Sequence, residues 1–146
     1  MATYSSPRYT ANTPYPQSGS NYGTLLSQTA TVTCAAAPAT TDTLNFFTMP
    51  KNSTVHLAVL KSSDMDTNGT PTLALNIGDA GSASRLFAAS TVGQAGTLST
   101  AIATTGAEYT YTADTVVTGV ASNNAATGAA GTVTLTVFYT CDGGAS

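Results

Sequence analysis

The chain has 146 residues and a formal net charge of −3, and 8% of its residues are charged. A typical soluble domain carries about 25% charged residues, so threonine, serine, asparagine and backbone groups must supply the polar surface. The four basic residues are scattered, whereas nucleic-acid binding needs clustered cations, and no segment approaches the ~18 apolar residues of a membrane span. We therefore expect neither a nucleic-acid partner nor a membrane partner.

Residues 1–24 form the first predicted segment, an extended N-terminal arm. Proline and glycine recur there and break any regular element, while tyrosines punctuate a polar run. Proline favours extended backbone, and tyrosine offers a large amphipathic contact area. We therefore expect the arm to lie along another surface; a disordered tail or a vector-like leader is the alternative. The expected contact residues are Tyr4, Arg8, Tyr9, Tyr15 and Tyr22. The segment has no apolar core of a signal peptide, which favours synthesis in a cytoplasm.

From residue 25 to residue 146 the chain predicts a β-sandwich domain, because apolar residues recur there with a period of two. In the sequence TVHLAVL, Val55, Leu57 and Val59 are expected to face the core. Two further segments alternate in the same way and place Leu73, Leu75, Ile77, Val133, Leu135, Val137 and Tyr139 in the core. Weaker strand candidates are residues 27–34, 43–49, 84–90, 97–103, 107–112 and 115–121.

Turn residues separate these candidate strands, and apolar residues nowhere follow helical spacing over a usable length. The best helical candidate, SASRLFAAS, is a single short stretch. Eight or nine short strands without intervening helices predict an all-β fold, an antiparallel β-sandwich that is jelly-roll-like. The Ala/Gly/Asn segment at residues 121–132 is expected to be an exposed tip.

No group of residues meets the requirements of an enzyme. Nucleophilic catalysis needs a base beside its nucleophile, and His56 is the only histidine. It lies within a predicted strand, on the face opposite Val55, Leu57 and Val59, where a lone histidine is usually a polar residue of a solvated or interface face. Asp64 and Asp66 are the only close pair of carboxylates, and alternate residues of an exposed loop seldom hold different pKa values. We therefore expect no catalytic residues and no cofactor.

The loop DMDTNG resembles the start of a calcium-binding loop, but only its first half fits. Asp64, Asp66, Asn68 and Gly69 match the positions of an EF-hand, whereas its twelfth position, which requires glutamate, is Leu75. The sequence therefore predicts a hairpin connection whose acids cap a turn, and no metal site.

Cys34 and Cys141 are too few and too far apart for a zinc site. In a reducing compartment such residues mostly behave as small buried hydrophobes. A disulfide that ties the first strand to the last is the alternative.

The segment from residue 44 to residue 90 resembles small structural proteins of tailed-bacteriophage heads, the capsid decoration or cement proteins. Each piece of the resemblance is short, and their order and spacing carry it. The pieces are Met49-Pro50-Lys51, Val55 to Leu60, Asp64-Met65-Asp66, Pro71 to Asp79 and Arg85-Leu86-Phe87.

This resemblance implies a β-sandwich, frequently a homotrimer, that sits on the outside of a capsid and bridges neighbouring subunits of the major capsid protein. It brings no catalytic residues. Two other functions stay open. One is another virion part, such as a head-fibre base, neck or tail component. The other is a carbohydrate-binding module, in which Tyr109 and Tyr111 would contact the glycan.

Overall fold

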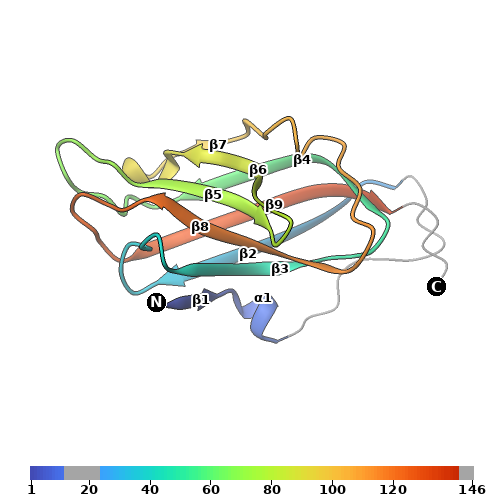
Figure 1. The fold of residues 1–146 in the computed structure, drawn as a ribbon, viewed down its shortest axis with the longest axis horizontal. Coiled ribbons are helices and arrows are strands. Elements are labelled where there is room, and N and C mark those ends of the chain that lie inside the picture. The colour runs from blue at the N-terminus through green and yellow to red at the C-terminus, as the bar shows by residue number, and fades with distance from the viewer. Residues whose placement is uncertain (12–23, 142–146) are drawn as a thin grey trace.

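Two β-sheets pack face to face in the computed structural model of this protein, which describes residues 1–11 and 24–141 (Figure 1). One sheet has the strand order β1-β3-β8-β5-β6, and the other has the order β2-β9-β4-β7. Among the strands of the described residues, only β1 and β3 pair in parallel. The elements are β1 (Thr3–Ser5), α1 (Pro7–Thr10), β2 (Leu26–Cys34), β3 (Thr43–Met49), β4 (Ser53–Ser62), β5 (Ala74–Asp79), β6 (Ser82–Ser90), the 3-10 helix η1 (Val92–Gln94), β7 (Leu98–Ser99), β8 (Thr115–Asn123) and β9 (Gly131–Cys141).

The connections explain the sandwich. From β2 to β9 the chain passes to the opposite sheet at every connection except the β5–β6 turn, and β9 returns to lie beside β2. Eight strands arranged in this way form a jelly-roll-like sandwich. The predicted all-β class and antiparallel β-sandwich are therefore confirmed. The division into an arm over residues 1–24 and a body over residues 25–146 stays a prediction.

The strands with the clearest alternation form the core as expected. The inward residues of β9 and those of the segment around β5 are fully buried, and together they fill the space between the sheets. These residues are Leu73, Leu75, Ile77, Val133, Leu135, Val137 and Tyr139. The period-two pattern succeeds there because each strand has one face toward the core and one face away from it.

Strand β4 contains a β-bulge at His56. Val55 pairs with Tyr139, and Leu57 pairs with Phe138, so His56 is an additional residue with no partner of its own on β9. A bulge of this kind shifts the side-chain alternation by one position. The face toward which each later residue of β4 points is therefore reversed.

The bulge overturns part of the predicted core. Ala58 and Leu60 are fully buried, whereas Leu57 is 42% exposed and Val59 is only partly buried. Of the three residues expected to face the core, only Val55 does so. The prediction for Leu57 and Val59 is wrong because strict alternation cannot anticipate an inserted residue.

Other predicted elements also differ from the structure. The helical candidate SASRLFAAS is strand β6, and the candidate at residues 97–103 contains only the two-residue strand β7. Residues 107–112 contain no strand and make one isolated bridge, between Thr110 and Thr54. Residues 1–11 contain β1 and α1, so the expectation that no regular element forms in the arm is wrong there.

Cys34 and Cys141 are both buried, as expected. Cys34 pairs with Gly131 at the start of β9, whereas Cys141 ends that strand. Ten residue steps of about 3.3 Å separate the two ends by roughly 33 Å, far beyond the 7 Å limit between the Cα atoms of a disulfide. The two cysteines do not form the alternative disulfide with each other.

Candidate functional site

The N-terminal residues lie against the body at the edge formed by β3 and β2. Strand β1 runs parallel to β3, and Figure 1 shows β1 and α1 together along that side of the sandwich. The backbone N–H of Ala2 donates to Oδ1 of Asp42 over 2.6 Å. The N–H of Ser6 donates to the carbonyl of Asn45 over 2.8 Å. These bonds cover the edge of β3, which would otherwise present unpaired backbone groups.

Side chains complete this docking. The Ser6 hydroxyl caps α1 by accepting from the N–H of Tyr9 over 3.1 Å, and it donates to the carbonyl of Phe46. Nε of Arg8 donates to Oε1 of Gln28 over 3.0 Å. Gln28 belongs to β2 and is 2% exposed. Its amide nitrogen donates to the carbonyl of Thr48 over 3.0 Å, so the residues at this edge link both sheets to α1.

The structure brings three of the five predicted arm contacts together. Tyr4 packs against the core, Arg8 bonds Gln28, and Tyr9 is 38% exposed. Tyr15 and Tyr22 lie outside the described residues. Sequence reasoning missed the role of Gln28, although a polar residue at an inward position of an alternating strand was a readable signal. A contact role for the five residues stays a prediction.

The loop that follows β4 is organised by Asp66, which is 1% exposed. Its carboxylate accepts four backbone N–H groups over distances between 2.7 and 3.0 Å, from Thr72, Leu73, Ala126 and Thr127. Burial alone would raise the pKa of Asp66, but these hydrogen bonds outweigh burial and hold the pKa of the carboxyl well below its usual range. The prediction that an acid caps this turn is confirmed.

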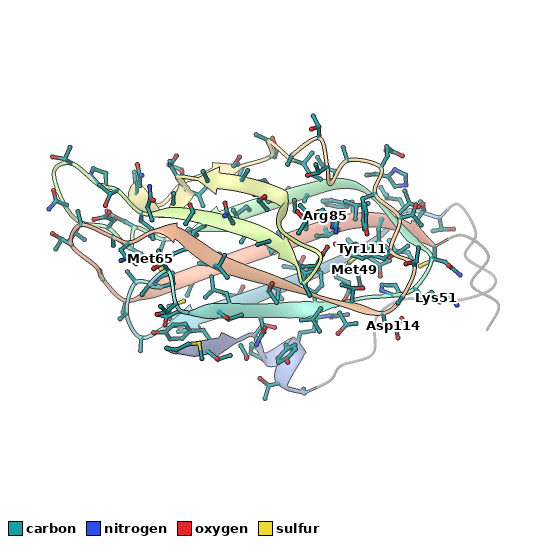
Figure 2. The ribbon with its side chains drawn as sticks, in the orientation of Figure 1. Met49, Lys51, Met65, Arg85, Tyr111 and Asp114 are labelled. Atoms are coloured by element: carbon teal, nitrogen blue, oxygen red, sulfur yellow. The ribbon has the colours of Figure 1, made fainter. Side chains whose placement is uncertain are left out.

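Asp66 also joins two loops that are distant in sequence. Thr72 and Leu73 belong to its own loop, whereas Ala126 and Thr127 belong to the loop between β8 and β9. Both loops lie at the same end of the sandwich (Figure 1), where Figure 2 labels the fully buried Met65. The predicted hairpin is wrong, because β4 and β5 belong to different sheets and the loop crosses between them.

The DMDTNG loop does not collect metal ligands. The Asp66 carboxylate faces four N–H donors, and Oδ1 of Asp64 accepts the N–H of Asp66 over 3.1 Å. Across residues 1–11 and 24–141, no group of three or more His, Cys, Asp or Glu residues is placed to hold a metal ion. Within the same part of the chain, no helix is long and apolar enough to cross a membrane.

The residues considered for carbohydrate binding, Tyr109 and Tyr111, pack with Asp79 and Arg85 beside a cavity of about 250 Å³. The carboxylate of Asp79 accepts two hydrogen bonds from Arg85, whose guanidinium carbon lies 3.7 Å from the ring centre of Tyr109. The ring of Tyr111 meets that of Tyr109 edge to face, with 5.0 Å between ring centres, and is 2% exposed. Figure 2 shows Arg85 beside Tyr111. The platform for a sugar is small, since Tyr111 is buried and Arg85 covers one face of the half-buried Tyr109.

His56 lies on the solvent side of β4. Its Nδ1 is 3.0 Å from Oε1 of Glu108, and its Nε2 is 2.9 Å from Oγ1 of Thr140. These contacts place a threonine hydroxyl, an imidazole and a carboxylate in the connectivity of a catalytic triad. The side chains of His56 and Glu108 are 33% and 70% exposed, so water is not excluded from them. These contacts fix the histidine ring at the bulge.

Taken together, the strand order, the docked N-terminal residues and the bonded loops define a jelly-roll-like β-sandwich protein. The chain matches no protein-family model and no curated protein. It matches a chain of the capsid asymmetric unit of cyanophage Pam1 with 43% identity and a TM-score of 0.75, over 88% of this chain and 91% of that chain. A chain from the capsid of Ralstonia phage GP4 matches with 28% identity and a TM-score of 0.83, over 95% of this chain and 97% of that chain. The chain therefore belongs to the family of bacteriophage capsid proteins that includes this chain of the Pam1 capsid.

Proposed function

We propose that this protein decorates the outside of a bacteriophage capsid and stabilises the shell by bridging neighbouring subunits of the major capsid protein. The observation that carries the proposal is the 43% identity to a chain of the Pam1 capsid over most of both chains. The resemblance of residues 44–90 to decoration proteins supports the exterior position. When one assembly binds several capsid subunits at once, many modest contacts combine into a high overall affinity.

The proposed partners are the major capsid protein and further copies of the chain in a homotrimer. The role is structural rather than enzymatic. Nucleic acid and membrane are not partners, since the surface has few and scattered cations. The chain is made in the host cytoplasm and then joins the virion.

The arm is proposed as the strap that grips the shell. Residues 2–8 are fixed to the body through Asp42, Asn45 and Gln28. Tyr9, at 38% exposure, lies at the root of the segment that continues toward Tyr15 and Tyr22. An anchored root reduces the entropy that an attached strap loses on binding.

The test is co-sedimentation of the purified protein with capsids that lack it. Deleting all of residues 1–24 would also uncover the edge of β3, so the sharper variant keeps residues 1–11 and replaces Tyr15 and Tyr22 with serine. The matched control replaces Asn12 and Thr13 with serine. We expect saturable binding of the unaltered protein and the control, and loss of binding in the double tyrosine variant. Absence of binding by the unaltered protein would overturn decoration, whereas equal binding by both variants would overturn only the strap.

Another virion part, such as a head-fibre base, neck or tail component, remains the second candidate. It differs from decoration in position and copy number. Electron microscopy of virions labelled on this protein would show label over the whole head for decoration, and label at one vertex or on the tail for the alternative.

A further inference from the structure

The side of the sheet β2-β9-β4-β7 that points away from the other sheet, here called the outer face, is nearly uncharged. Threonines occupy most outward positions of β2 and β9 and bond to one another across the strands. Oγ1 of Thr29 lies 2.9 Å from that of Thr136, and Oγ1 of Thr31 lies 2.8 Å from that of Thr134. Cross-strand threonine pairs of this kind stabilise the sheet and leave methyl groups on its surface.

All three exposed leucines of the described residues belong to this face. Leu57, Leu98 and Leu25 are 42%, 58% and 59% exposed. Leu98 pairs with the outward Lys61, and Leu25 directly precedes β2, where it continues the outward side. Phe138 lies directly opposite Leu57 and is only partly buried. The three leucines lie apart along the face, and Leu57 with Phe138 forms its apolar centre. Exposed apolar groups that share one face of a sheet favour an interaction surface there.

The bulge at His56 creates the centre of this surface. Without the additional residue, the alternation of β4 would direct Leu57 and Val59 inward and Ala58 and Leu60 outward. The bulge reverses these directions, so an exposed leucine stands beside Phe138. Bulges are known to re-aim side chains next to functional surfaces. His56 gives up its own pairing with β9, and this loss directs Leu57 to the outer face, where a partner can cover it.

The charges at the two ends of β4 indicate what that partner is. Lys61 is exposed, and the ion pairs of the described residues do not include it. Glu108, bound to His56 at the other end of the strand, has a side chain that is 70% exposed. Five residue steps of about 3.3 Å place His56 roughly 16 Å from Lys61. If a second copy packs its outer face against this one with the two β4 strands antiparallel, each Lys61 lies near Glu108 of the other copy. Leu57 and Val59 then lie between the two Lys61–Glu108 pairs.

We propose that two copies of this chain associate through their outer faces across a two-fold axis that crosses β4 between Leu57 and Lys61. Strands β2, β9 and β4, about 4.8 Å apart and about 30 Å long, cover roughly 430 Å² on each copy, and β7 adds only two residues. This is about half of the ~800 Å² per partner that standard-size interfaces bury, so we expect a weak contact. The contact is isologous and self-complementary, so it is distinct from the heterologous contact within a trimer. This two-fold contact is a further association of the chain and does not depend on the proposed decoration function.

Sedimentation equilibrium of the full chain over a range of concentrations tests the proposal without capsids. We expect a step that doubles the mass of the basic unit, whether that unit is one chain or three. Leu57→Asp should raise the dissociation constant of this step at least about tenfold, because it buries an unpaired carboxylate at the centre of the contact. The matched control is Ala83→Asp, which adds the same charge at an exposed position of the other sheet and should leave the step unchanged.

A charge reversal tests the antiparallel arrangement. Lys61→Glu and Glu108→Lys should each weaken the doubling step several-fold, and the double variant should restore it. The proposal is overturned if the unaltered chain shows no doubling up to about 200 µM, a weak-contact limit near 5 kcal/mol, or if Leu57→Asp behaves like Ala83→Asp. Failure of the double variant to recover overturns the two-fold geometry. If Leu57→Asp does not fold by circular dichroism, Leu57→Thr replaces it, with the same expected direction.

Discussion

Oδ1 of Asp66 accepts a hydrogen bond from the backbone N–H of Thr127 over 2.9 Å, across 61 residues of sequence. The other carboxylate oxygen accepts from Thr72, Leu73 and Ala126. One side chain therefore satisfies buried or part-buried donors in two loops that cross between the sheets. Since an unmet buried donor is costly, Asp66 fixes the geometry of this end of the sandwich.

Replacing Asp66 with asparagine should lower the thermal midpoint clearly. The amide has nearly the same shape but keeps only one acceptor oxygen, and its NH2 group would face backbone donors. The matched control is Asp64→Asn, since Asp64 is exposed and accepts a single hydrogen bond through Oδ1. We expect a loss several times larger for Asp66→Asn, with faster amide exchange at Thr72, Leu73, Ala126 and Thr127. Equal midpoints for the two variants would contradict this role.

Stability should fall as the pH drops below about 4. The folded-state pKa values of Asp42, Asp66 and Asp79 are all lowered. Backbone hydrogen bonds are the main cause for Asp42. For Asp66 and Asp79, burial would raise the pKa, but the hydrogen bonds that each carboxylate accepts outweigh it. A group with a lowered folded pKa stabilises the protein above its unfolded value of about 3.9, and this contribution is lost as the pH falls toward the folded value. The contribution of these aspartates to the thermal midpoint should therefore be constant between pH 5 and 7, and the midpoint should decline from about pH 4 downward.

The same pH series identifies the contribution of Asp66. The difference in midpoint between the unaltered protein and Asp66→Asn should be largest near neutral pH and should narrow below about pH 4, because the unfolded aspartate then binds a proton. A difference that stays constant down to pH 2 would show that Asp66 acts by shape alone.

The sequence predicts the class of fold well where one face of a strand is simply buried. The inward residues of β9 alternate without interruption from Val133 to Tyr139, and the period alone identifies them. Prediction from the period fails at His56 of β4, because the bulge depends on the register between β4 and β9 and not on the residues of β4 alone. Tertiary pairing there overrides a local pattern.

The surfaces are harder to predict than the core. Tyrosine and proline content identifies the N-terminal segment as unusual, but nothing local indicates that residues 3–5 pair with β3. The partners of Asp66 lie in its own loop and in the loop between β8 and β9, and no spacing rule connects those two loops in sequence. Long-range hydrogen bonds of this kind become visible only when the topology places both loops at one end.

Docking of residues 1–11 should depend on Gln28. Gln28→Ala removes the acceptor of Arg8 and the donor to the carbonyl of Thr48. Trypsin cleaves after arginine, so the rate of cleavage after Arg8 reports local release of α1 from the body. We expect Gln28→Ala to speed this cleavage at least several-fold under native conditions. Thr29→Ala, a neighbouring change on the exposed side of β2, is the matched control, and equal rates in the two variants would contradict the docking role.

Cys34 should be unreactive in the folded protein. Burial, with a smaller effect from the negative charge of Asp42, raises the pKa of Cys34 to about 11. At pH 8 only about one thiol in 1,000 is then ionised, and the thiolate is the reactive form. Iodoacetamide should therefore label Cys34 slowly at pH 8 in a Cys141→Ser variant, and rapidly after denaturation in guanidinium chloride. Labelling at the same rate before and after denaturation would mean that this end of β2 opens readily, because a buried thiol cannot react without exposure.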